Sequence, residues 1–173
     1  PVGMVRNLMA SKASEAITLV GAEESDWPPC MRKIIADLAN GVNVNHFGRL
    51  FLASISATLA LPEESCIGFF RGAPDFSEAT TTYQVNHVYN GAYTPASCSK
   101  LKLNHNCPVL PGDDRLCDIS WMDHPLKYIR ATQRWKAKNQ QSEAKIRQDD
   151  VPLEEEKLGV DESSESSSKS SGD

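Results

Sequence analysis

The 173-residue sequence lacks several features that would place it in a large protein class. Its longest apolar stretch, residues 50–61, is interrupted by Ser54, Ser56 and Thr58 and is shorter than the roughly 20 residues that cross a bilayer. We therefore expect no membrane span. Aromatic residues make up only 7%, and the net charge of −5 gives no overall basic signature of nucleic-acid binding. Charge alone leaves that function open, because a linear count does not show surface patches.

A secretory leader is also lacking at the start of the sequence. The chain begins at Pro1, with no initiator Met and no charged-then-apolar segment, so we expect it to begin inside a longer polypeptide. Five cysteines in such a chain favour reduced thiols and metal ligation over a disulfide framework, and the odd number leaves at least one outside any pairing. These features predict a reducing, cytoplasmic location.

The charged residues are distributed unevenly along the chain. Residues 1–138 carry a net charge of +1, whereas residues 139–173 carry −6. The end of the chain is rich in Ser, Asp and Glu and has too little apolar surface to offset the entropy of ordering. We expect a connector or the end of an upstream domain at 1–23 and a helical domain at 24–138. Residues 139–173 are expected to hold a helix extension and a disordered acidic tail.

The apolar spacing between residues 27 and 138 predicts an all-α domain. One helix follows Pro28-Pro29 and stops at Asn40-Gly41, because Pro favours a helix start and Gly a helix end. Four more are expected to run from about Asn45 to Ala60, from Pro62 through Cys66, from Ser77 to about Gly91, and from His124-Pro125 to Lys136. The segment between residues 91 and 124 reads as a long loop. No strand or internal repeat is predicted.

Four of the cysteines stand in loops or at helix starts, where sulfur atoms can converge on a metal: Cys30, Cys98, Cys107 and Cys117. A tetrahedral zinc ion and a [4Fe-4S] cluster both accept four thiolates. The gaps of 67, 8 and 9 residues contain no tight Cys-x₂₋₄-Cys pair, which disfavours zinc. Spacing alone leaves unrelated buried thiols equally open, because free cysteine is among the most buried residue types. Cys66, beside Ile67 and two phenylalanines, fits the core best.

The residues around these cysteines resemble those of archaeal and eukaryotic DNA primase large subunits, in the C-terminal iron–sulfur domain. The matching segments occur in order from about Asp26 to Arg130: Pro28-Pro29-Cys30-Met31-Arg32-Lys33, His46-Phe47-Gly48-Arg49, Tyr83-Gln84-Val85-Asn86-His87, Tyr93-Thr94-Pro95-Ala96-Ser97-Cys98, Cys107-Pro108, Cys117 and His124-Pro125-Leu126-Lys127-Tyr128. The short gap from Cys107 to Cys117 resembles the archaeal form.

The resemblance implies two helical parts joined by a [4Fe-4S] cluster on Cys30, Cys98, Cys107 and Cys117. It also implies a regulatory, non-catalytic subunit that assembles with a small catalytic subunit. Such a domain would bind the single-stranded DNA template and the 5′-triphosphate end of the initiating nucleotide or RNA primer.

The residues that this resemblance implies for nucleic-acid binding are His46, Arg49, Tyr83 and His87. At helical spacing, His46 and Arg49 lie one turn apart, as do Tyr83 and His87. A guanidinium fork and imidazoles suit phosphate oxygens, and a tyrosine ring offers a stacking face. Asn45 and Asn86 stand where relatives of the family carry basic residues, so we expect affinity to be weaker or placed differently.

Two other functions remain as alternatives. The first is a zinc-stabilised helical adaptor that binds protein partners, which iron analysis would separate from a cluster protein. The second is a cluster-dependent nuclease or repair enzyme. It would need a set of metal-binding carboxylates that the sequence does not show. We therefore predict no catalytic residue.

Overall fold

The computed structural model describes residues 21–149, and these residues form helices and loops without any strand. The elements in order are η1 (Glu24–Asp26), α2 (Pro29–Ala39), α3 (His46–Thr58), α4 (Glu63–Phe70), α5 (Glu78–Asn90), α6 (Cys98–Leu103) and α7 (Pro125–Asp149). The expected all-α class is confirmed. Residues 1–20 of the connector expected at 1–23, and residues 150–173 of the segment 139–173 expected to hold the acidic tail, lie outside the described residues. None of the described helices is long and apolar enough to cross a membrane.

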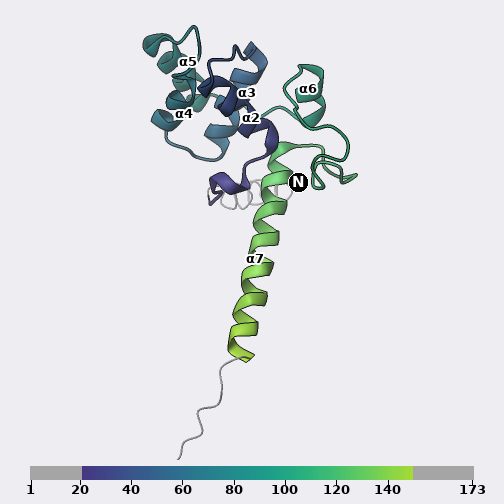
Figure 1. The fold of residues 1–173 in the computed structure, drawn as a ribbon. Helices are drawn as coiled ribbons and strands as arrows, with labels where there is room; N and C mark the ends of the chain where they lie inside the picture. The colour runs from purple at the N-terminus through teal and green to yellow at the C-terminus, as the bar shows by residue number, and fades with distance from the viewer. Residues whose placement is uncertain (1–20, 150–173) are drawn as a thin grey trace, which may run out of the picture.

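Helices α2 to α5 pack against one another and form the larger of two parts (Figure 1). Their apolar stripes meet in one core, which includes the fully buried Met31, Leu38, Phe51, Leu52, Ile55 and Cys66. Gly72 lies directly against the end of α2, where any Cβ atom would collide with the Leu38 carbonyl oxygen. The turn between α4 and α5 therefore depends on a glycine for its close approach to α2.

The second part consists of α6, the loop that follows it and the start of α7, on the opposite side of α2 from α4 and α5 (Figure 1). Two hydrogen bonds tie this part together before α7 begins. The amide of Cys98 donates to the Asp123 carbonyl at 3.0 Å, and His124 Nε2 contacts the Pro95 carbonyl at 3.1 Å. The segments on either side of the loop are thereby held next to each other.

The expected helix starts agree with the structure, whereas one expectation inside the second part does not. The sequence predicts a long loop that includes residues 98–103, but Ser97 caps a short helix there by accepting from the Lys100 amide at 3.4 Å. Six residues are too few for apolar periodicity to show. Helix α7 runs past Lys136 to Asp149, in the segment for which a helix extension is expected. The extension consists mostly of residues with high helix propensity, such as Ala, Lys, Gln and Glu. It therefore forms a helix although it does not pack against the core.

Candidate functional site

A cavity of about 230 Å³ lies between α3 and α5. Its lining includes all four residues that the family resemblance implies for nucleic-acid binding: His46, Arg49, Tyr83 and His87. The two pairs come from different helices, so the sequence spacing could not show that they share one site. Tyr93, from the loop after α5, completes the lining with apolar residues of both helices.

The α3 side of the cavity is set by the start of that helix. Asn45 Oδ1 accepts from the Gly48 amide at 2.9 Å, which caps the helix and fixes His46 as its first residue. The same oxygen accepts from Asn106 Nδ2 at 3.0 Å, and Asn45 Nδ2 donates to the Asn104 carbonyl at 2.9 Å. Gly48 makes room for this contact, because a Cβ atom there would lie 2.7 Å from Asn106 Oδ1. The cap residue therefore also joins the two parts of the molecule.

Arg49 is held by a network that the sequence did not reveal. Its Nε donates to the Val44 carbonyl at 2.8 Å, and Nη2 donates to Asn43 Oδ1 at 3.0 Å. Its two terminal nitrogens also contact both carboxylate oxygens of Asp75, at 3.1 and 2.8 Å. Hydrogen bonding from Arg49 holds the pKa of Asp75 below its usual value. The guanidinium is thus fixed in orientation and already paired with an anion.

Aromatic side chains form the α5 side of the cavity. The rings of Tyr83 and His87 lie nearly parallel, with centroids 6.4 Å apart and an interplanar angle of 13°. Tyr93 meets His87 edge-on at 5.9 Å, and Gly91 permits this because a Cβ atom there would lie 2.7 Å from the Tyr93 ring. Tyr83 is 73% exposed, so its face is open to a planar ligand. The sequence places Tyr93 only in a cysteine loop, and its position in this cavity depends on the fold.

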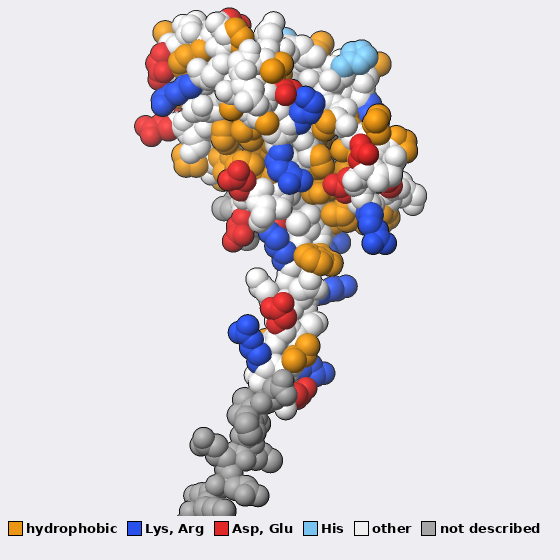
Figure 2. Space-filling model, in the orientation of Figure 1, with side chains coloured by type: hydrophobic (Ala, Val, Ile, Leu, Met, Phe, Trp, Pro, Cys, Tyr) orange, Lys and Arg blue, Asp and Glu red, His pale blue; other side chains and the backbone are white. Residues whose placement is uncertain are grey.

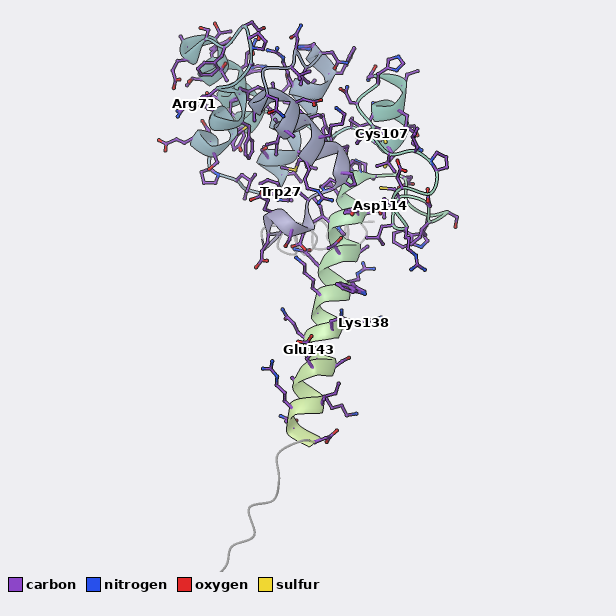
Figure 3. The ribbon with its side chains drawn as sticks, in the orientation of Figure 1. Trp27, Arg71, Cys107, Asp114, Lys138 and Glu143 are labelled. Atoms are coloured by element: carbon purple, nitrogen blue, oxygen red, sulfur yellow. The ribbon has the colours of Figure 1, made fainter. Side chains whose placement is uncertain are left out.

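The four nominated cysteines line a second, smaller cavity between α2, α6 and the start of α7. Cys30 is in the first turn of α2, Cys98 begins α6, and Cys117 and Cys107 come from the loop after α6, where Figure 3 labels Cys107. The other lining residues are apolar or aromatic: Pro28, Pro29, Leu101, Val109, Met122, Pro125 and Tyr128. Four thiols from distant segments therefore face one largely apolar space.

Burial raises the pKa of three of these thiols, those of Cys30, Cys98 and Cys117. It raises the pKa of Cys30 far above the usual value, with a smaller opposing hydrogen bond from the Met31 backbone and further raising by the other three thiols. Burial likewise raises the pKa of Cys98, and it raises the pKa of Cys117 to about 11 together with the nearby Asp114. Without a positive charge in the cavity, Cys30, Cys98 and Cys117 stay protonated at neutral pH.

Asp114 holds the cysteine loop against α7, a role that the sequence analysis did not assign (Figure 3). Its Oδ1 accepts from the Leu116 amide at 2.9 Å and from the Cys117 amide at 3.4 Å. Its Oδ2 accepts from the Tyr128 hydroxyl at 3.0 Å. Burial, followed by this hydrogen bond, raises the pKa of Tyr128 to about 12. Asp114 therefore positions Cys117 relative to α7, whose residues Pro125 and Tyr128 also line the thiol cavity.

Cys66 is separate from the thiol cavity. It is fully buried in α4 within the core, and burial raises the pKa of its thiol to about 11 despite hydrogen bonds with Ser56 and Tyr89. Across residues 21–149, no group of three or more His, Cys, Asp or Glu side chains that could hold a metal ion is found. The four thiols of the cavity thus do not form such a group, and the alternative of a zinc-stabilised adaptor gains no support.

Comparison with known proteins gives a consistent result. A family model for the C-terminal domain of the eukaryotic and archaeal DNA primase large subunit matches residues 22–148. The DNA primase large subunit PriL of Thermoplasma acidophilum is 43% identical over 116 residues, which are 65% of this chain and 34% of that protein. The proteins of the same name from Thermoplasma volcanium and Methanocella arvoryzae are 34% and 37% identical over 77% and 66% of this chain, and 41% and 31% of their own lengths.

No solved structure gives a significant match. The chain spans about a third to two fifths of the length of these curated relatives.

Proposed function

The chain belongs to the family formed by the C-terminal domain of the eukaryotic and archaeal DNA primase large subunit, and from this premise we propose that it binds the template and the 5′-triphosphate end of the initiating nucleotide or RNA primer. In this role it is a non-catalytic module of the large subunit. A separate small subunit, its partner in a heterodimer, joins the nucleotides. The role belongs to DNA replication in the cytoplasm.

The observation that carries this proposal is the cavity between α3 and α5. It combines a guanidinium, two imidazoles and an open tyrosine face within one space of about 230 Å³. A 5′-terminal nucleotide presents the complementary groups, because its phosphates accept from guanidinium and imidazole and its base stacks on an aromatic ring. No Asp or Glu lines the cavity, whereas two-metal phosphoryl transfer needs carboxylates to hold its metal ions. This composition supports binding over catalysis.

The contact between Asp75 and Arg49 indicates how Arg49 would bind such a ligand. The carboxylate holds the guanidinium through a two-point contact, which is the geometry that a phosphate also uses. Asp75 is largely exposed, so it can leave without a buried charge remaining behind. Val44 and Asn43 keep the guanidinium in place during this exchange. A bound phosphate would therefore replace Asp75 at an arginine that is already oriented.

The four thiols of the second cavity suit a [4Fe-4S] cluster. Cysteine thiolates are the usual ligands of such clusters, and the positive charge of the iron would stabilise the thiolates that burial opposes. The thiols come from α2, α6 and the loop before α7, so a shared cluster would join the two parts of the molecule. In this setting the cluster supplies a structural link that holds the α6 part against the helical core.

Arg49→Ala tests the proposed binding role. We expect this substitution to weaken binding of a 5′-triphosphate primer–template by roughly tenfold to a hundredfold, because a hydrogen-bonded charged contact contributes about 1.5–3 kcal/mol. Fluorescence anisotropy with labelled duplexes measures the change. A duplex with a 5′-hydroxyl should bind the wild type and the variant alike, and higher salt should reduce the difference between them.

Two further variants keep the result interpretable. Arg71→Ala is the matched control, because Arg71 is exposed and pairs with Glu78 at 3.8 Å, outside the cavity (Figure 3). Tyr83→Ala removes an exposed ring that the core does not need, so it tests the same site without disturbing the network around Arg49. With the small subunit present, Arg49→Ala should reduce primer initiation far more than extension. Equal losses in both assays, with thermal stability unchanged, would disprove the proposal.

A further inference from the structure

Helix α7 carries a stripe of basic side chains that the proposed function does not use. Its 25 residues include seven Lys or Arg and two Asp or Glu. At 3.6 residues per turn, five of the seven fall within a sector of roughly 80°: Lys127, Arg130, Arg134, Lys138 and Lys145. We call these five residues the basic stripe. It extends along about 27 Å of the helix, at 1.5 Å per residue.

Lys138 and Lys145 are exposed beyond the body of the molecule, whereas Arg130 and Arg134 line a cavity together with Glu23 and Asp26 at η1. The side of α7 that packs includes the buried Pro125, Tyr128 and Ile129. On the same side, Lys136 pairs with Asp26 of η1 at 2.6 Å. Helical geometry places Lys138 and Lys145 opposite this packed side, and α7 projects from the body of the molecule as a single rod (Figure 1). Figure 2 shows Lys and Arg side chains standing out along the rod.

The outer half of the stripe forms no ion pair with the described part of the chain, and the nearest acidic residue on its face is Asp149, one turn after Lys145. Lys127 pairs with Asp123 at 2.7 Å, and Arg130 makes interactions of its own. Arg134, Lys138 and Lys145 are exposed, and no ion pair with residues 21–149 involves them. Arg134 and Lys138 are four residues apart, a spacing at which like charges destabilise a helix. A partner with closely spaced negative charges would remove that repulsion.

A duplex backbone has the matching charge pattern. It carries one negative charge per roughly 1.7 Å of its axis, counted over both strands, so a row of cations over about 27 Å can contact phosphates where the strands cross it. A lipid surface fits less well, because the apolar flank beside the stripe holds only Trp135 and Ile146, which are three turns apart with Asn139 and Ser142 between them. The acidic residues 150–173, with a net charge of −6, would compete with a duplex for the basic stripe.

We infer that the basic stripe of α7 is a second nucleic-acid site, which binds the phosphodiester backbone of a duplex independently of its sequence and of its 5′ end. The inference builds on the proposed function, since it assigns duplex nucleic acid to the same molecule. Its physical basis is separate, because the stripe lies on the projecting helix and shares no residue with the cavity between α3 and α5. The stripe would hold a duplex whose end is bound elsewhere.

A matched pair of substitutions tests the stripe. Lys138→Gln and Arg147→Gln remove one positive charge each from exposed positions of α7, but only Lys138 belongs to the stripe. Glutamine keeps a good helix propensity, which circular dichroism verifies. Binding of a blunt 5′-hydroxyl duplex is measured by anisotropy over a range of salt concentrations. We expect Lys138→Gln to lower the slope of log affinity against log salt by roughly one, and Arg147→Gln to leave it nearly unchanged.

The triple variant Arg134→Gln, Lys138→Gln and Lys145→Gln should lower this slope by roughly three, equally for duplexes with a 5′-hydroxyl and a 5′-triphosphate. Arg49→Ala, in contrast, should affect only the triphosphate duplex, so failure of either proposal is visible separately. The same measurements are made on the chain without residues 150–173. Equal slopes for the matched pair in both chains, or stripe-dependent binding to anionic phosphatidylserine vesicles but not to duplex, would overturn the inference.

Discussion

At the scale of single residues, the site depends on contacts that join positions far apart in the sequence. The two-point pairing of Arg49 with Asp75 spans 26 residues and fixes the guanidinium beside the cavity. Nothing in the local sequence around Asp75 indicates this partner. Its carboxylate occupies the place that an anionic ligand would take, so it both orients Arg49 and competes with the ligand.

Asp75→Asn should therefore strengthen binding of a 5′-triphosphate duplex. The asparagine removes the competing negative charge, while Val44 and Asn43 still orient the guanidinium. Since exposed ion pairs are weak, we expect a gain of roughly twofold to fivefold. Arg49 holds the pKa of Asp75 below its usual range, so the gain should be constant around neutral pH. Anisotropy titrations measure it, and weaker binding by Asp75→Asn would show that the carboxylate supports the site.

At the scale of elements, short caps and loops place the chemistry while the core helices provide a rigid support. Asn45 caps α3 and joins it to the segment after α6, and Asp114 joins the cysteine loop to α7. The thiol cavity lies where the cysteine loop meets the helices, and the cavity between α3 and α5 begins at the capped end of α3.

Asn45→Ala should lower the free energy of unfolding by about 1–2 kcal/mol, because it removes the cap of α3. It also removes the bonds to Asn104 and Asn106. Ser77→Ala is the comparison, since Ser77 caps α5 through a longer contact of 3.5 Å. Asn45→Asp keeps the acceptor oxygen and should recover most of the loss. Urea denaturation measures all three, and equal losses at Asn45 and Ser77 would mean that the link between the two parts contributes nothing.

The cysteines allow a second test at this scale. Replacing Cys30, Cys98, Cys107 or Cys117 by Ser should each reduce the iron content of anaerobically purified protein from about four atoms per chain and lower its melting temperature. Cys66→Ser should retain the iron, because Cys66 lies in the core outside the thiol cavity. Iron and sulfide analysis with visible absorption is the measurement. Iron that depends on Cys66, with one of the other four dispensable, would refute the ligand assignment.

At the scale of the whole molecule, a folded body is joined to a projecting helix. Residues 137–149 are all exposed, so no part of the core rests on them (Figure 1). Stability should therefore come from the body, whereas the rod is available for binding.

Removal of residues 140–173 should leave the melting temperature and the iron content unchanged. The deletion takes away Lys145 of the basic stripe, so duplex binding should become less salt-sensitive, whereas deletion of residues 150–173 alone should not have this effect. Differential scanning calorimetry and anisotropy separate these two consequences. A clear fall in melting temperature after the longer deletion would contradict the assignment of stability to the body.

The sequence by itself determined the helical class, most helix starts and the family resemblance. These follow from local causes: Pro28-Pro29 before α2, Asn45 before α3, Ser77 before α5 and Pro125 at the start of α7 fix helix starts through short-range sterics and hydrogen bonds. Helix α6 was missed because six residues are too few to show a period.

Only the tertiary structure decided which residues share a site. It brought His46 and Arg49 together with Tyr83 and His87, added Asp75 and Tyr93, and gathered four thiols from segments up to 87 residues apart in the chain. It also showed that Arg134, Lys138 and Lys145 of α7 are exposed, whereas Lys136 of the same helix pairs with Asp26, because only packing defines which side of a helix is buried. Local sequence sets backbone conformation, but contacts between distant segments depend on how the whole core closes, which no local pattern contains.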